Sequence, residues 1–404
     1  MPKLTIRDVE LTNKRVLIRV DFNVPLAEDG LTITDDTRIR ETLPTIEYAL
    51  RRKAKVILCS HLGRPKGKPN PKMSLRPVVA RLRDLLDHIL GEDENVAFSP
   101  DCVGEVAEEM ANSLEPGQTL LLENLRFHAE EEANDPAFAK KLASLCDIYV
   151  NDAFGSAHRA HASTEGITHF VPLSVEGLLL EKEVTYLSKA LVQPDKPFVA
   201  IIGGAKVSDK IKVIDNLLDK VDALIIGGGM AYTFLKAKGQ DVGKSLVELD
   251  KLDIAKAALD KAAARGVRFL LPLDHKLADK FAPDAKTQIF SGTGAFPADW
   301  MALDIGPKSI EIFKSEIAEA RTIVWNGPMG VFEMPAFANG TMQIAQAVAD
   351  NQDATTIVGG GDSVAAVKKA GVADRITHIS TGGGASLEFL EGKKLPGVEA
   401  LTNK

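Results

Sequence analysis

The stretch Phe198-Val-Ala-Ile-Ile-Gly-Gly-Ala-Lys-Val-Ser-Asp-Lys210 decides the fold. Its apolar, β-branched run Val199–Ile202 predicts a buried strand. Two glycines follow, and we place Lys206 and Lys210 beyond them on the first turns of a helix. With this arrangement α/β proteins present backbone N–H groups and a helix N-terminus to phosphate. For this stretch alone, an ordinary strand–helix turn with surface lysines is the alternative.

The second half of the chain repeats the pattern. Four more apolar runs end in glycine-containing turns, namely Ala223–Ile226 before Gly227–Gly229, Thr322–Trp325 before Asn326–Gly330, Thr355–Val358 before Gly359–Ser363, and Ile376–Ser380 before Thr381–Ala385. Glycine there allows the backbone to approach phosphate closely. Five such turns predict a nucleotide site, and Asp362 is the candidate contact for its Mg²⁺, which prefers oxygen ligands.

The first half also alternates strands and helices. The expected strands are Lys14–Asp21, Lys55–Cys59, Asn95–Phe98, Thr119–Leu122 and Asp147–Val150, and the helices between them are Asp36–Leu50, Leu75–Leu90, Val103–Leu114 and Asp135–Leu145. This alternation predicts a doubly wound, mostly parallel sheet. The fold class is therefore α/β, with two doubly wound domains.

Cationic side chains follow the strands of the first half. Because the carboxyl ends of parallel strands share one edge of a sheet, these side chains should lie together. Guanidinium suits bidentate binding of phosphate or carboxylate. We predict a site for a small polyanion made of His61, Arg64, Arg126 and Arg159, joined by Arg38, with Asp21 and Asn23 available to hold a hydroxyl. A solvated surface cation is the alternative for any single arginine.

Composition and charge exclude several classes of function. Hydrophobic residues make up 45% and charged residues 26% of the 404 residues, which is typical of a globular protein. The net charge of −7 argues against nonspecific nucleic-acid binding. No apolar run is long enough to span a membrane, and the N-terminal residues lack the apolar region of an export signal, so we expect a cytoplasmic protein.

Metal-binding and redox motifs are equally sparse. Cys59, Cys102 and Cys146 lack CxxC or Cys/His ligand spacing, so we interpret them as buried, reduced thiols. His158 and His161 have the spacing of a metal pair but no obvious carboxylate or cysteine partner, which argues against ligation.

Common nucleotide motifs are absent. Gly239–Ser245 resembles a Walker A loop but has three residues, not four, between its glycines, and it follows a helical pattern. No Gly-x-Gly-x-x-Gly fingerprint opens a helix after a strand, and the protein kinase signatures are missing.

A connector separates the two halves. Ser174 is the expected N-cap of a helix that runs through Glu181 to Val192, and the prolines up to Pro197 stop it. A simple surface helix is the alternative. The expected domains are 1–173 for the anion site, 174–197 for the hinge helix and linker, and 198–390 for the nucleotide.

Eight segments together resemble the phosphoglycerate kinase family in order and spacing, from about residue 15 to the C-terminus. They are Asp21–Pro25, Ser60–Pro65, Glu123–Arg126, Asp152–Arg159, Gly203–Ser208, Trp325–Glu333, Gly359–Asp362 and Ser380–Gly384. Ser363 stands where the family pattern often has threonine, which keeps the hydroxyl. Leu273–Ala285 follows the pattern loosely, and His275 and Lys276 receive no role.

The resemblance implies a monomeric, two-lobed glycolytic kinase that transfers phosphate between 1,3-bisphosphoglycerate and Mg-ADP. By position, 3-phosphoglycerate would be held by the seven residues of the predicted anion site. ATP or ADP would contact Gly203, Lys206, Lys210, Asn326, Glu333 and the turn of Gly360, Gly361, Asp362 and Ser363, with Asp362 on the metal. The segment 391–404 would cross back onto the first domain.

The implied reaction explains the lack of a general base. The acceptor is a carboxylate that is ionised near neutrality, so catalysis consists of positioning and charge stabilisation. We expect Lys206 and Arg38 to neutralise the transferred phosphoryl group, aided by N–H groups of Gly382, Gly383 and Gly384. Two separate anion sites also imply domain closure.

Two other classes share parts of this pattern. A two-lobed solute-binding protein also clamps small anions, but it would carry an export signal. A nicotinamide-dependent dehydrogenase needs the absent fingerprint. An assay for 3-phosphoglycerate-dependent ADP formation separates all three.

Overall fold

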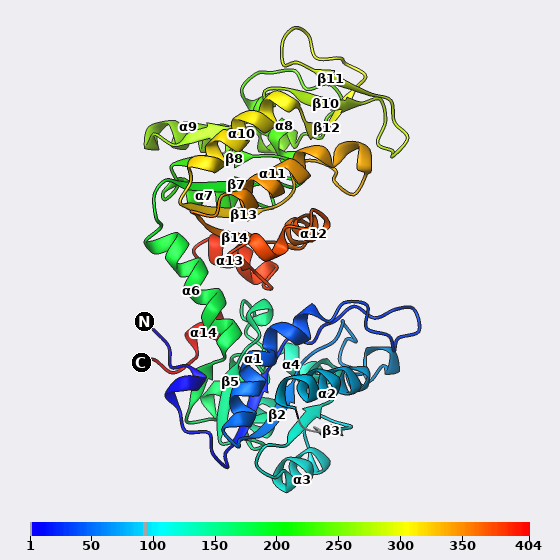
Figure 1. Cartoon of the computed structure of the whole chain (residues 1–404), viewed down its shortest axis with the longest axis vertical. Helices are drawn as coiled ribbons and strands as arrows, with labels where there is room; N and C mark the ends of the chain where they lie inside the picture. The colour runs from blue at the N-terminus through cyan, green and yellow to red at the C-terminus, as the bar shows by residue number, and fades with distance from the viewer. Residues whose placement is uncertain (1, 92–94) are drawn as a thin grey trace. The chain divides into compact units, whose positions relative to one another are not determined.

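The computed structural model describes residues 2–91 and 95–404, and its contacts divide the chain into two compact units (Figure 1). Unit 1 comprises the chain up to Val184 together with Lys394–Lys404, and unit 2 comprises Thr185–Lys393. The boundary falls inside helix α6, Leu178–Val192. The expected connector 174–197 thus spans this boundary.

Unit 1 is built on a six-stranded, all-parallel sheet in the order β3-β4-β2-β1-β5-β6. Its strands are β1 Arg15–Arg19, β2 Lys55–Cys59, β3 Val96–Ser99, β4 Thr119–Leu122, β5 Ile148–Asn151 and β6 Ser174–Glu176. Its helices, besides the first part of α6, are α1 Thr37–Arg51, α2 Arg76–Leu90, α3 Glu105–Ser113, α4 Ala129–Glu132, α5 Pro136–Ala143 and α14 Pro396–Glu399. The predicted parallel α/β fold of this half is confirmed.

The core of unit 1 follows the apolar periodicity of its elements. In α2, Val78, Leu82 and Leu85 lie one helical turn apart, are buried, and pack in one cluster with Val16 and Ile18 of β1. Helix α2 ends at Gly91, whose φ of 71° is the left-handed conformation that glycine adopts most readily. This packing fixes the strand ends from which the polar loops emerge.

Ser174 does not cap α6, contrary to the sequence-based expectation. Ser174–Glu176 forms β6 beside β5, so the chain reaches Gly177 before the helix begins. The N-terminus of α6 is instead capped from β5, because Oδ1 of Asp152 accepts hydrogen bonds from the N–H groups of Leu179 (2.9 Å) and Leu180 (3.2 Å). A cap supplied from a distant strand leaves no local sequence signal.

The C-terminal segment lies within unit 1. Asn403 forms an antiparallel bridge with Lys3, and the N–H of Leu4 donates to the carbonyl of Thr402 at 2.8 Å. The side-chain amide of Asn151 donates to the carbonyl of Gly397 at 3.1 Å. These contacts pair the two ends of the chain near the sheet edge formed by β6.

Unit 2 contains a second six-stranded parallel sheet, in the order β15-β14-β13-β7-β8-β9, which confirms the predicted parallel fold of this half. Its strands are β7 Phe198–Ile202, β8 Ala223–Ile226, β9 Arg268–Leu270, β13 Thr322–Asn326, β14 Thr355–Gly359 and β15 His378–Ile379. Its helices, besides the rest of α6, are α7 Ile211–Leu218, α8 Met230–Ala237, α9 Leu252–Arg265, α10 Pro307–Glu319, α11 Asn339–Asp350, α12 Gly361–Lys369 and α13 Gly384–Leu390.

A small antiparallel sheet, which the sequence did not predict, is added to unit 2. Its strands are β10 His275–Ala278, β11 Thr287–Phe290 and β12 Met301–Ile305, in the order β11-β10-β12. His275 and Lys276 therefore belong to its central strand. The exposed β11 lacks the apolar alternation that would have revealed it in the sequence.

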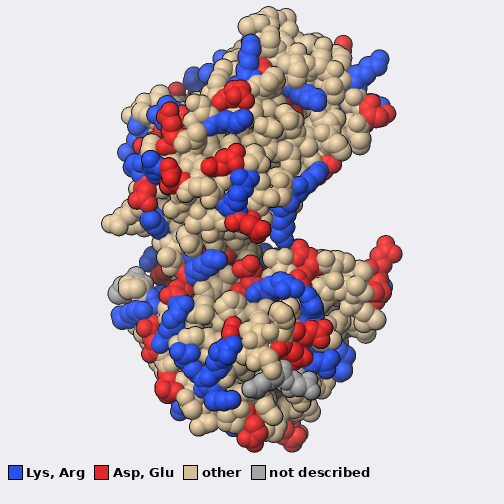
Figure 2. All heavy atoms as spheres, viewed as in Figure 1, with Lys and Arg blue, Asp and Glu red and all other residues tan. Residues whose placement is uncertain are grey.

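Charges of both signs are mixed over the surface. On the face drawn in Figure 2, Lys and Arg atoms alternate with Asp and Glu atoms over both units, without an extended basic surface. This pattern agrees with the negative net charge.

Candidate active site

Asp21, Asn23 and Arg38 meet at the carboxyl end of β1. Nη1 of Arg38, in the first turn of α1, donates to Oδ2 of Asp21 at 2.6 Å. Asn23 accepts a hydrogen bond from the N–H of Gly63 at 2.9 Å, which joins the loops after β1 and β2. Burial raises the pKa of Asp21, but the His61 ring and the positive charges of Arg38 and Arg19 outweigh it and hold that pKa below its ordinary value. Asp21 is therefore an anion that orients Arg38.

His61 lies buried at the end of β2. Its Nδ1 is 3.0 Å from Nη2 of Arg19, and because guanidinium only donates, Nδ1 must accept. Burial lowers the pKa of His61 well below its ordinary value, and nearby arginines act in the same direction. His61 is thus a neutral imidazole with its proton on Nε2, which makes it a hydrogen-bond donor at the sheet edge.

Arg126 is positioned by the loop after β4, the 3₁₀ helix η3 Leu125–Phe127. The side chain of Asn124 accepts from the N–H groups of Leu62 and Arg126 and donates to the carbonyl of Leu62, so it ties this loop to the one after β2. Nη1 of Arg126 donates to the carbonyl of Gly63 at 2.9 Å, and Nε forms an ion pair with Oε1 of Glu132 at 3.4 Å. The guanidinium is thereby held in place before any ligand binds.

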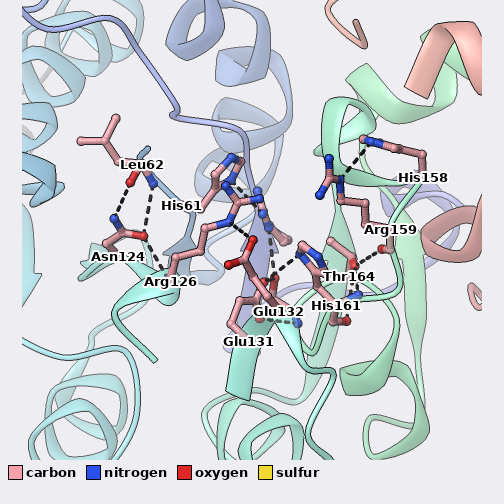
Figure 3. Close-up of polar contacts among 12 residues, drawn as sticks. His61, Leu62, Asn124, Arg126, Glu131, Glu132, His158, Arg159, His161 and Thr164 are labelled. Atoms are coloured by element: carbon pink, nitrogen blue, oxygen red, sulfur yellow. Dashed lines mark hydrogen bonds and ion pairs between the residues drawn. The ribbon is translucent and has the colours of Figure 1, made fainter. Parts of the chain in front are cut away.

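Arg64 and Arg159 are the exposed members of the predicted anion site. Nε of Arg159 donates to Nε2 of His158 at 3.2 Å. Figure 3 shows Arg126 and Arg159 reaching toward the region of His61 from different loops. The structure thus collects cations from the loops after β2, β4 and β5.

The histidine pair at 158 and 161 has no ligand-like arrangement. His158 accepts from Arg159, whereas His161 is buried with Nδ1 4.0 Å from a carboxylate oxygen of Glu131. Burial lowers the pKa of His161 to about 4, and neighbouring arginines act in the same direction. Neither residue belongs to a three-ligand cluster within the described part of the chain.

A buried network beneath the anion site escaped the sequence analysis. Arg19 is fully buried, and its Nε donates to the hydroxyl of Ser163 at 3.2 Å. Glu131, also fully buried, accepts from the N–H (2.9 Å) and the hydroxyl (2.6 Å) of Ser163. Burial raises the pKa of Glu131, although Arg19 acts in the opposite direction. An arginine inside the apolar run of β1 was the available signal.

In unit 2, all five glycine turns follow adjacent strands, in the spatial order β15-β14-β13-β7-β8. Several glycines serve contacts between these turns. A Cβ on Gly203 would lie 2.0 Å from the carbonyl oxygen of Pro328, and one on Gly327 would lie 2.1 Å from that of Gly203. The N–H of Gly203 donates to the carbonyl of Asn326 at 3.0 Å. Gly203 is therefore required for the close packing of these two turns, and its contact with a nucleotide stays a prediction.

Other glycines do offer open backbone. A Cβ on Gly361 or Gly383 would meet nothing within 4 Å, whereas one on Gly360 would approach the side chain of Asn326 at 3.2 Å. Gly361 is the first residue of α12, and Gly383 precedes α13, which begins at Gly384 as expected. The N–H of Gly382 already donates to the hydroxyl of Ser380 at 3.2 Å. Gly383 and Gly384 are thus better placed than Gly382 to meet an anion.

Lys206 and Lys210 precede α7, whose first residue is Ile211. The prediction that both lysines lie on the first turns of the helix was therefore wrong. Lys206 is exposed in the turn. Lys210 donates to Oδ1 of Asn326, and burial lowers its pKa to about 8 although Asp362 and Asp209 act in the opposite direction. Nδ2 of Asn326 is buried without a hydrogen-bond partner. An unpaired buried N–H is costly unless a ligand accepts from it.

At the start of α12, Asp362 and Ser363 differ in exposure. Asp362 is exposed and lies in the first turn of α12. Glu333, in the loop after β13, is also exposed. Ser363 is fully buried, and its hydroxyl accepts from the N–H of Gly327 at 2.6 Å. The Ser363 hydroxyl therefore holds two turns together, and its contact with a nucleotide stays a prediction.

Two α/β units, one with cations at a sheet edge and one with open glycine turns, define the class of two-domain α/β phosphotransferases. A profile described as phosphoglycerate kinase matches residues 6–393, and the chain belongs to the phosphoglycerate kinase family. It is a phosphotransferase of glycolysis and uses ATP.

Similar proteins match over their whole length. The phosphoglycerate kinases of Acidobacterium capsulatum and Koribacter versatilis are 80% and 72% identical over 404 residues, which cover 100% of both chains. The solved structure of phosphoglycerate kinase from Coxiella burnetii is 45% identical, with a TM-score of 0.89 over 99% of this chain and 98% of the other. That from Pyrococcus horikoshii is 34% identical with a TM-score of 0.82, over 98% of each chain.

The predicted family and the fold of two mostly parallel α/β units are confirmed by these matches. Within the described residues, no helix is both long and apolar enough to cross a membrane.

Proposed function

We propose that this enzyme catalyses reversible, Mg²⁺-dependent transfer of phosphate from 1,3-bisphosphoglycerate to ADP, giving 3-phosphoglycerate and ATP. The observation that carries the proposal is the prearranged cation set of unit 1. Arg38 is oriented by Asp21, Arg126 by the carbonyl of Gly63, and neutral His61 by Arg19. Guanidinium groups fixed in this way suit a small ligand with phosphate and carboxylate ends.

The remaining polar groups fit the same ligand. The exposed Arg64 and Arg159 are available for its terminal phosphate. Asn23 and the Asp21 carboxylate can hold its hydroxyl, since carboxylate and amide oxygens accept from O–H. A ligand with phosphate, hydroxyl and carboxylate groups is a hydroxy acid phosphate.

The nucleotide is proposed to bind at the turns of unit 2. The unpaired N–H of Asn326 beside Gly360, the half-buried Lys210 and the open backbone at Gly361 supply donors for phosphate oxygens. Exposed Glu333 is available for a ribose hydroxyl. A single exposed carboxylate, Asp362, fits Mg²⁺, which keeps waters and substrate phosphates as its other ligands. When bound, Mg²⁺ neutralises phosphate charge.

In the direction that consumes ATP, the substrate's own carboxylate attacks the γ-phosphorus in line. With a pKa of roughly 3.5 it is ionised near neutrality, so no residue removes a proton. We assign Lys206, Arg38 and the backbone around Gly383 and Gly384 to neutralising the phosphoryl group in the transition state. His61 fits this scheme because its Nδ1 accepts from Arg19 and its Nε2 carries a proton, so the ring offers a ligand a hydrogen-bond donor and not a base.

Direct transfer requires the two bound substrates to meet, and we propose that substrate binding closes the molecule and excludes water. X-ray scattering tests this step. The radius of gyration should fall when 3-phosphoglycerate and a nonhydrolysable Mg-ATP analogue are both present. An unchanged value with both sites saturated contradicts closure.

The function itself is tested by a coupled assay for ADP release. ATP with 3-phosphoglycerate and Mg²⁺ should give turnover, and omission of any one of the three should abolish it. A matched pair of variants links the activity to the site. Arg126→Lys keeps the charge but loses the fork and should raise the KM for 3-phosphoglycerate at least tenfold, whereas Arg83→Lys, on the exposed side of α2, should not. ATP hydrolysis that ignores 3-phosphoglycerate overturns the proposal.

We further propose that the enzyme is a cytoplasmic monomer. Light scattering coupled to gel filtration should give the mass of one chain. A stable dimer mass would contradict this.

A further inference from the structure

Three potential metal ligands that have no role in the site described above converge in unit 1. Asp101 and Cys102 follow β3, and His128 follows η3. A carboxylate oxygen, the Sγ atom and a ring nitrogen of these residues lie within 4.8 Å of one another. In residues 2–91 and 95–404 this is the one group of three His, Cys, Asp or Glu side chains whose ligand atoms lie close enough to hold a metal ion. The 25 residues between Cys102 and His128 explain why ligand spacing in the sequence did not reveal it.

The positions of two ligands are fixed by hydrogen bonds. Nε2 of His128 is 2.7 Å from Oδ1 of Asp101, which also accepts from the N–H of Cys102 at 2.6 Å. The hydroxyl of Ser99 donates to the carbonyl of Asp101 at 2.6 Å. The ring of His128 packs against Phe138, with centroids 5.2 Å apart. Hydrogen bonds and ring packing thus fix the positions of Asp101 and His128 relative to Cys102.

The cluster borders a cavity that gives access to it. Asp101 and His128 line a cavity of about 580 Å³ together with Ser74 and Glu123, and their side chains are 48% and 29% exposed. Cys102 is fully buried beside them. An ion can therefore enter from the cavity, and a water in the cavity can complete its coordination.

We propose that Asp101, Cys102 and His128 bind a divalent transition metal, with Zn²⁺ as the ion that fits best. Thiolate, imidazole and carboxylate are together the ligands of Zn²⁺, whereas Mg²⁺ and Ca²⁺ take oxygen ligands only. Three protein ligands leave one position of a tetrahedron for water. With bonds of about 2.0 to 2.3 Å, neighbouring ligand atoms lie roughly 3.3 to 3.8 Å apart. Modest side-chain adjustments therefore convert the hydrogen-bonded cluster into a coordination shell.

Binding exchanges protons for the ion. The thiol of Cys102 releases its proton to solvent and binds as thiolate, which the metal stabilises. His128 would bind through Nε2, so the proton that Nε2 shares with Asp101 must leave this nitrogen, to solvent or to Nδ1, and the neutral bound ring carries its one proton on Nδ1. The hydrogen bond between His128 and Asp101 is replaced by two bonds to the metal. No oxidant or reductant takes part.

Cobalt absorption tests the proposal, because Co²⁺ replaces Zn²⁺ in sites of this kind and reports its ligands. Untagged enzyme is titrated with Co²⁺ in excess Mg²⁺, which occupies oxygen-only sites. We expect tetrahedral bands in the visible and a thiolate-to-cobalt band in the near ultraviolet, both reversed by Zn²⁺. Cys102→Ser should lose the thiolate band, and Cys146→Ser, which removes another buried thiol of unit 1, should keep it. A wild-type protein without these bands, or an unchanged spectrum in Cys102→Ser, overturns the proposal.

Two further variants guard against a misfolded cysteine variant. Asp101→Asn and His128→Gln alter more exposed side chains, and each should weaken Zn²⁺ binding at least tenfold in competition with a chelator of known affinity. Glu130→Gln, which changes an exposed carboxylate two residues from His128, should bind Zn²⁺ as the wild type does. Equal affinity in all four proteins overturns the assignment.

Discussion

Nη2 of Arg19 lies 3.0 Å from Nδ1 of His61, and both side chains are buried under the sheet edge that carries Arg64, Arg126 and Arg159. This contact connects folding to function. It determines the tautomer of His61, and it places a permanent positive charge in the core close to Glu131. Removing either partner should therefore have a separate, measurable effect.

Replacing Arg19 should destabilise unit 1. Arg19→Met leaves the buried carboxyl of Glu131 without its neighbouring cation, and removing one member of a buried charged pair typically costs about 3 to 5 kcal/mol. Urea unfolding followed by circular dichroism measures the effect. Arg15→Met is the matched control on the same strand, because its partly exposed pair with Asp147 is worth about 1 kcal/mol or less. Equal losses in both variants would contradict the special role of Arg19.

The two nitrogens of His61 can be tested separately. Asn at this position places an oxygen near Nδ1 and keeps the acceptor for Arg19, whereas Gln places its amide nitrogen near Nε2 and keeps the donor. We expect His61→Gln to retain more kcat/KM for 3-phosphoglycerate than His61→Asn, by roughly tenfold for one hydrogen bond to a charged group. His61→Asn should be the more stable protein. The reverse order in both measurements would refute the assigned tautomer.

Lys206 should matter for turnover more than for binding. If it neutralises the transferred phosphoryl group, Lys206→Ala lowers kcat by about 100-fold or more and changes the KM values little. Lys212→Ala, at the exposed start of α7, is the control and should keep wild-type turnover. Steady-state kinetics at saturating Mg-ATP measures both. Near-normal kcat in Lys206→Ala would rule out the proposed role.

Asp152, the cap of α6, should make stability depend on pH. Burial raises its pKa to about 7, despite its hydrogen bonds with Thr45 and the N–H groups of Leu179 and Leu180. Between its ordinary pKa and this value, the folded state binds more protons than the unfolded state, so stability falls as pH rises from about 4 to about 7.

Asp152→Asn keeps the cap and removes this titration. Its stability relative to wild type should increase across that window, by up to about 4 kcal/mol. Unfolding midpoints at pH 5 and pH 8 give the comparison. The control Asp147→Asn should instead be less stable than wild type by a constant amount at pH 5 and pH 8. Burial raises the pKa of Asp147, but the hydrogen bonds and charge of Arg15 lower it further, so this carboxylate is ionised and stabilising throughout that range. Parallel pH profiles for wild type and Asp152→Asn would disprove the expectation.

Sequence periodicity revealed those parts of the fold that depend on local pattern. The strands and the polar residues at their carboxyl ends were predictable, because an apolar run followed by Asp21, His61 or Arg126 is a local signal. The family resemblance then gave the ligands. The boundaries of helices shifted by one or two residues, as for α1, which begins at Thr37.

What the sequence could not reveal depends on contacts between distant segments. Asp152 caps a helix that begins after an intervening strand, and the Ser363 hydroxyl accepts a hydrogen bond from the N–H of Gly327. The convergence of Cys102 and His128 likewise requires the three-dimensional loops. Glycine has two uses that look identical in sequence, tight packing at Gly203 and open backbone at Gly361, and only the structure separates them.

This difference between glycines yields the last prediction. Gly203→Ala puts a methyl group 2.0 Å from the carbonyl of Pro328, in the tight packing between the turns after β7 and β13, and should cost about 1 to 3 kcal/mol or more. Gly361→Ala meets open space in a helical first turn, so stability should change by no more than about 0.5 kcal/mol. Its methyl group nevertheless occupies the approach to the open backbone, and the KM for ATP should rise. Thermal unfolding and ATP kinetics on both variants check the contrast. A Gly361→Ala enzyme with unchanged ATP kinetics would remove that turn from the nucleotide site, whereas a fully stable Gly203→Ala protein would show that the turns after β7 and β13 are free to separate.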